Sequence, residues 1–251
     1  MKKLSKALLA LMLGAFAITG CSNQNAGQDQ GQQTEQAADN QANESQPADN
    51  QASEQKNDNS ATEDALKGVS EQNPIFVDKE NKTVTIYTTF NGKFLTEPTR
   101  HLAIYNQGKL ADMAYFSSYA STEDFYKGLE EIGATPGNNM TADNAATTKT
   151  EGTDLKVTLF WNGNENGTDV NDAIQDSNGN KINMRFSGNK DNSKEFNTGC
   201  ISCLDSCFVG ITSNATYSLG AIEERGEVVF KANADKLPQD KEAVALVYSV
   251  N

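Results

Sequence analysis

Histidine is almost absent from this chain, with His101 the only one among 251 residues. A Ser–His–Asp triad would have to use His101, and the sequence contains no G-x-S-x-G nucleophile motif. It also lacks a Walker phosphate loop and a G-x-G-x-x-G dinucleotide motif. These absences leave an enzymatic activity uncertain and favour a non-catalytic role, because His101 would be the only base that titrates near neutral pH.

Basic residues are also scarce. The chain has 21 lysines and arginines against 34 aspartates and glutamates, which gives a formal net charge of −13. A chain this acidic is repelled by phosphate backbones and by anionic lipid headgroups. We therefore expect no nucleic-acid partner.

Long hydrophobic runs are missing except at the start, where an apolar run over residues 7–18 follows three lysines. This run has the length of a signal-peptide core and is too short for a permanent transmembrane helix. It ends in Ile-Thr-Gly-Cys at 18–21, which resembles the lipobox of bacterial lipoproteins. The resemblance implies cleavage before Cys21, lipidation of Cys21 with acyl chains such as palmitate, and an extracytoplasmic domain anchored to the cell membrane. An ordinary secretory signal with a chance cysteine, or a buried helix, is the alternative.

Residues 22–60 contain no Leu, Ile, Val, Met, Phe, Tyr or Trp. Such a segment cannot bury enough apolar surface to offset the entropy of ordering, so it is predicted to be disordered. The predicted organisation is therefore a lipoprotein signal peptide at 1–20, a lipidated cysteine and tether at 21–72, and one folded domain at 73–251.

The domain is predicted to be α+β, with a mostly antiparallel sheet, one clear helix and a cysteine-bearing loop. Ser121 or Thr122 can cap the helix, and Phe125, Leu129 and Ile132 form its apolar face. A segment at 169–176 fits either a short helix or a strand. The other segments alternate apolar and polar residues and are predicted as strands: 75–77, 84–89, two strands within 100–119, 154–161, 181–188, 226–232 and 243–250.

The predicted loop carries three of the four cysteines, Cys200, Cys203 and Cys207, in the pattern C-x₂-C-x₃-C. They could hold an iron–sulfur cluster, although Asn197 stands where a ferredoxin motif has its first cysteine. They could instead bind a single soft ion such as zinc or copper, with His101 as the fourth ligand.

Two further interpretations need no cofactor. Cys200 and Cys203 have the two-residue spacing of an exchangeable redox disulfide, which leaves Cys207 as a resolving or partner-binding thiol. Alternatively, one disulfide is purely structural, the third thiol is inert, and the domain is a non-catalytic interaction module. The sequence leaves all four interpretations open.

Several strings resemble one family, the YdjY-like domain of exported bacterial proteins: TRH at 99–101, DFYKGLEEIGATPGNNM at 124–140, FSGN at 186–189 and NTGCISCLDSCFVGITSNATY at 197–217. The resemblance covers about residues 73–250, and the cysteine string is its most specific part. Members tend to have proline after the third cysteine, where this chain has Phe208.

The resemblance implies that Cys200, Cys203, Cys207, Arg100 and His101 form one site, but it implies no settled activity. The expected function is a membrane-anchored surface lipoprotein whose cysteine motif binds a metal or redox centre. Such a protein would have an accessory or electron-transfer role, with a protein redox partner or surface partner.

Overall fold

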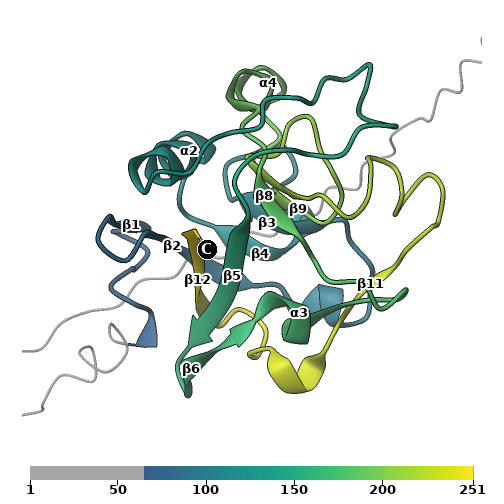
Figure 1. The fold of residues 1–251 in the computed structure, drawn as a ribbon. Helices are drawn as coiled ribbons and strands as arrows, with labels where there is room; N and C mark the ends of the chain where they lie inside the picture. Colours follow the sequence, from purple (N-terminus) through teal and green to yellow (C-terminus); the bar gives the residue numbers. More distant parts are fainter. Residues whose placement is uncertain (1–64, 251) are drawn as a thin grey trace, which may run out of the picture. The chain divides into compact units, whose positions relative to one another are not determined.

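The computed structural model describes residues 65–250 (Figure 1). The predicted signal peptide, Cys21 and most of the predicted tether lie outside these residues. Within the described part of the chain, no helix has the length and hydrophobicity needed to cross a bilayer.

One ten-stranded sheet forms most of the described domain (Figure 1). Its strands are β1 (Ile75–Asp78), β2 (Thr83–Phe90), β3 (His101–Tyr105), β4 (Ala114–Ser118), β5 (Leu155–Trp161), β6 (Asn164–Asp169), β8 (Met184–Phe186), β9 (Cys200–Cys203), β10 (Thr212–Asn214) and β12 (Ala243–Val250). A small second sheet pairs β7 (Ile174–Asp176) with β11 (Phe230–Ala232). The helices are α2 (Thr122–Glu131), α3 (Val170–Ala173), α4 (Lys190–Phe196), and the 3₁₀ turns η1 (Gly92–Leu95), η2 (Ala111–Met113) and η3 (Ala234–Lys236).

The α+β class agrees with the sequence prediction, but the sheet is mixed and the expected antiparallel arrangement is only partly right. β3 pairs parallel with β4, and β9 pairs parallel with β10. The sequence indicated a strand pair within 100–119 that turned near Gly108. In the structure the chain continues through η2 before β4 begins, so β4 starts beside the start of β3, with His101 opposite Ala114.

The main sheet curls until its two ends approach each other. In strand order β8 is the last strand and β5 is the second, yet an isolated antiparallel bridge joins Asp154, just before β5, to Arg185 in β8. The interior of the curl holds large side chains that are almost fully buried, among them Phe90, Phe116 and Tyr248. In the strand order, β3, β9 and β10 are direct neighbours, and this part of the sheet carries the cysteines.

The predicted helix is confirmed as α2, which lies against the sheet in Figure 1. The Ser121 hydroxyl accepts a hydrogen bond from the backbone N–H of Asp124, as expected of a helix cap. Phe125 and Leu129 are fully buried, and the Phe125 ring packs edge-to-face on Tyr248 with centroids 4.7 Å apart. The ambiguous segment at 169–176 contains both alternatives, α3 followed by β7.

The expected cysteine-bearing loop is partly a strand. Cys200–Cys203 form β9, which pairs with β3 on one side and with β10 on the other. Cys207 lies in the connection between β9 and β10, and that connection is buried except for the half-buried Phe208. The cysteines are therefore part of the sheet and its core.

Candidate metal centre

An irregularity in the pairing of β3 with β9 sets the direction of two cysteine side chains. Cys203 lies opposite His101 and Cys200 opposite Ile104, with register shifts between these pairs. In a regular strand, residues three positions apart point to opposite faces of the sheet. Here the His101 Nδ1 lies 3.9 Å from the Cys200 Sγ and 4.0 Å from the Cys203 Sγ. The bulge therefore brings both thiols to one imidazole.

Two glycines allow β9 to lie close to the turn after β3. A Cβ on Gly108 would lie 2.5 Å from the Gly199 Cα, so no larger residue fits there without a backbone shift. Gly199, which precedes Cys200, has a left-handed φ of +81° and its carbonyl accepts the Tyr105 N–H at 2.7 Å. This close backbone contact fixes the start of β9, and with it the position of Cys200.

The donor atoms have a spacing that suits one tetrahedral ion. The His101 nitrogen and the Cys200 and Cys203 sulfurs all lie within 4.8 Å of one another, and all three residues are buried. Zinc bonds of about 2.3 Å to sulfur and about 2.0–2.1 Å to nitrogen place N and S about 3.6 Å apart in a tetrahedron. The observed distances from the His101 Nδ1 to the two sulfurs, 3.9 and 4.0 Å, exceed this separation by only a few tenths of an ångström.

Cys207 lies beside this group but outside the set of three close donors. Hydrogen bonds with Cys200 and Cys203 lower the pKa of its thiol well below the usual value, and Arg100 lowers it further. Hydrogen bonding and burial raise the pKa of Cys203. For Cys200, a hydrogen bond with Cys203 lowers the pKa, but Cys207 and burial outweigh it and raise the value to about 12. Among the three free cysteines, these interactions thus favour the thiolate form on Cys207 and the thiol form on Cys200 and Cys203.

The imidazole of His101 is neutral at physiological pH. Burial, followed by the nearby positive charge of Arg100, lowers its pKa to about 4. Its Nδ1 faces the two sulfurs, so a lone pair on this atom can coordinate a metal.

A buried ion pair lies next to the thiols. The Arg100 Nη2 is 2.5 Å and its Nε 3.1 Å from the Asp205 Oδ1, and the Asp205 side chain is fully buried. The Gly220 N–H donates to the other carboxylate oxygen at 3.1 Å. Burial raises the pKa of Asp205 to about 6 although Arg100 opposes the shift. Asp205 has no motif of its own in the sequence, and its only signal there is its place between the second and third cysteines.

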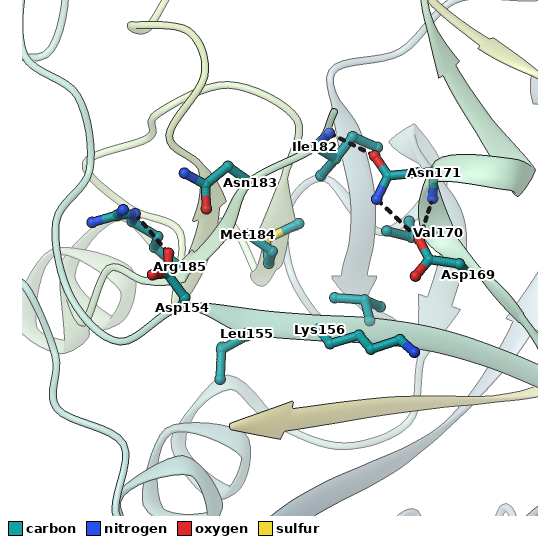
Figure 2. Close-up of a pocket in the computed structure, with 11 residues that line it drawn as sticks. Asp154, Leu155, Lys156, Asp169, Val170, Asn171, Ile182, Asn183, Met184 and Arg185 are labelled. Atoms are coloured by element: carbon teal, nitrogen blue, oxygen red, sulfur yellow. Dashed lines mark hydrogen bonds and ion pairs between the residues drawn. The ribbon is translucent and has the colours of Figure 1, made fainter. Parts of the chain in front are cut away.

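A cavity of about 230 Å³ adjoins the donors and is lined in part by His101, Cys200 and Cys207. A larger cavity of about 340 Å³ lies elsewhere, at the seam between β5 and β8 (Figure 2). Four of its polar side chains form two pairs: Arg185 Nε with Asp154 at 3.0 Å, and Asn171 with Asp169 at 2.9 Å. The seam cavity contains no cysteine or histidine, so it is the smaller cavity that offers metal-binding chemistry.

The structure thus brings together His101, Cys200 and Cys203, places Cys207 against them, and sets Arg100 beside them in an ion pair with Asp205. The fold and this site define a β-sheet domain with a buried thiol–imidazole cluster that is compatible with metal binding.

Comparison with known proteins confirms the resemblance noted in the sequence. The YdjY domain family matches residues 75–249, and the chain belongs to this family. The uncharacterised protein YdjY of Escherichia coli (strain K12) is 44% identical over 193 residues, which cover 77% of this chain and 86% of that protein. No solved structure matches the chain.

Proposed function

We propose that this protein is a lipid-anchored, extracytoplasmic accessory protein whose domain binds one soft metal ion through His101, Cys200, Cys203 and Cys207. The observation that carries the proposal is the convergence of the His101 Nδ1 and two sulfurs within 4.8 Å in a buried site. Thiolate and imidazole ligands suit zinc(II) and copper(I), and copper would also support an electron-transfer role.

The spacing of the donors favours a single ion over an iron–sulfur cluster. A cluster distributes its thiolates over several irons, whereas these donors lie close enough to share one atom. The free thiols favour a metal over a structural disulfide. Outside the cytosol, thiols that are close together tend to oxidise, and coordination to a metal would protect them.

The test uses the whole chain with a Cys21→Ala substitution, prepared without oxygen. Metal, acid-labile sulfide and free thiols are counted, and cobalt(II) is then titrated into the metal-free protein. We expect one equivalent of a soft metal, no sulfide, and tetrahedral cobalt bands with sulfur-to-cobalt charge transfer. A preparation with one disulfide, one free thiol and no affinity for zinc, copper or cobalt would refute the metal proposal in favour of an interaction module.

Variants distinguish loss of a ligand from loss of stability. Cys203→Ser is expected to weaken cobalt binding at least about 100-fold, because it removes a direct ligand and even an outer-shell contact is worth about 10–100-fold. Ile201→Val is the matched control, since its fully buried side chain belongs to the main core and the change costs about 0.5–1.5 kcal/mol of stability. Equal cobalt affinity in the two variants would contradict the proposed ligand set.

The anchor has its own test. We expect the intact chain to incorporate labelled palmitate in bacteria and to fractionate with membranes, and Cys21→Ala to do neither. Incorporation that persists in Cys21→Ala would refute the anchor without affecting the metal site.

A further inference from the structure

The metal position faces a cavity on the side where Cys207 lies. The cavity of about 230 Å³ is lined by His101, Cys200 and Cys207, whereas Cys203 does not line it. Of the three cysteines that the structure describes, Cys207 is also the one outside the group of three close donors. An ion held by His101, Cys200 and Cys203 would therefore have its fourth position on the cavity side, within reach of Cys207.

The walls of the cavity are mainly apolar. They include Leu110, Phe196, Phe208 and Leu219, and the Phe196 and Phe208 rings pack edge-to-face at 5.4 Å. Phe196 is 42% exposed, so the wall reaches the surface. An apolar cavity of about 150 Å³ can already hold a molecule of the size of benzene. This cavity therefore has room for a ligand with a few carbon atoms.

The charges around the cavity select against anions. Glu223 and Glu224 line it and are exposed, and the chain has a net charge of −13. Arg100, the cation that also lines the cavity, is paired with the buried Asp205. A negatively charged ligand would therefore meet two carboxylates without a free positive charge to offset them.

We propose that the metal keeps an exchangeable fourth position, which Cys207 occupies at rest and a small uncharged thiol occupies by entering from the cavity. This inference rests on the proposed metal site. In the exchange the metal–sulfur bond to Cys207 breaks and a metal–sulfur bond to the incoming thiol forms. The thiol's proton passes to the Cys207 sulfur, so charge and electrons balance without an oxidant. Zinc sites that act on substrates keep one exchangeable coordination position, whereas structural zinc sites have all four positions filled by the protein. With an exchangeable fourth position, the site would therefore bind a substrate.

The test adds ethanethiol to the cobalt-loaded chain that carries Cys21→Ala and follows the charge-transfer band, with cobalt counted after desalting. We expect the band to change while cobalt stays bound, and mercaptoacetate, the matched anionic thiol, to bind at least tenfold more weakly. A band that ethanethiol leaves unchanged on a cobalt-loaded protein would overturn the exchange and leave the metal site intact. A chain that takes up no cobalt would instead refute the metal site itself.

Two variants locate the exchange. Leu219→Trp should fill the cavity and weaken ethanethiol binding at least tenfold with little change in cobalt affinity. Leu95→Trp, at an exposed position that does not line this cavity, should change neither. Cys207→Ser should still bind cobalt and should take ethanethiol more tightly, because the internal competitor has been removed. Loss of cobalt binding by more than about 100-fold in Cys207→Ser would show that Cys207 is an obligatory ligand, and would overturn the proposal.

Discussion

Replacing Arg100 with methionine is expected to destabilise the domain by about 3–5 kcal/mol. Arg100 donates two hydrogen bonds to Asp205, whose side chain has no exposure to solvent. Without the guanidinium, the carboxylate keeps only the Gly220 N–H at 3.1 Å as a partner. The destabilisation reflects a buried charge left without its counterion, so neutralising that charge as well should reverse much of it. The double variant Arg100→Met with Asp205→Asn is expected to regain at least about 2 kcal/mol.

Urea unfolding followed by circular dichroism measures these differences, with metal removed and thiols reduced so that binding does not contribute. Lys127→Met is the control, because Lys127 forms an exposed pair with Glu123 at 2.8 Å in α2. Such exposed pairs contribute little to stability because water and salt screen them. If Arg100→Met cost no more than Lys127→Met, the Arg100–Asp205 pair would not be shielded from water and the reasoning would be wrong.

Three further predictions test the fold. Gly152→Ala should cost more than about 3 kcal/mol in urea unfolding, because Gly152 has a φ of +112° and the new Cβ would lie 2.1 Å from the Phe186 carbonyl oxygen. Gly163→Ala is the control: Gly163 has a φ of +88° but open space around it, so the change should cost only about 1–2 kcal/mol. Burial raises the pKa of Tyr115 to about 12, above the value of about 10 in the unfolded chain. The contribution of the neutral tyrosine to the free energy of unfolding is therefore present below pH 10 and is lost as the pH rises from 10 to 12. Tyr115→Phe should reduce this loss by up to about 2.7 kcal/mol in unfolding measured across that range. Ser121→Ala should lower thermal stability by about 1 kcal/mol, and an unchanged melting curve would contradict the observed cap.

Helix α2 was predictable because its signals are local. The apolar spacing of Phe125, Leu129 and Ile132 and the capping Ser121 lie within a few residues of one another, and the structure contains them as expected. Alternation of apolar and polar residues likewise indicated β1 to β5, β8, β11 and β12, but not β6, β9 or β10. The direction of β4 relative to β3 depends on contacts distant in sequence, so alternation did not reveal the parallel pair.

The candidate site was only half predictable. The clustering of the cysteines and the scarcity of histidine drew attention to these residues, but only the family resemblance indicated that they would meet. Their meeting depends on a register shift between β3 and β9 and on the contact of Gly199 with Gly108. The Gly-, Ser- and Asn-rich surroundings of the cysteines indicated a loop, whereas Cys200–Cys203 form a strand. A regular strand would also place Cys200 and Cys203 on opposite faces.

The connection between the parallel strands β9 and β10 is short. Parallel neighbours usually need a crossover of a dozen or more residues, yet here residues 204–211 complete it, and Cys207 lies in its middle. In the proposed exchange, a sulfur on so short a tether would stay near the metal after it dissociates, at an effective local concentration of about millimolar or higher. A dissolved thiol must reach a comparable concentration to compete with it, so the domain would respond to abundant thiols and ignore traces of them.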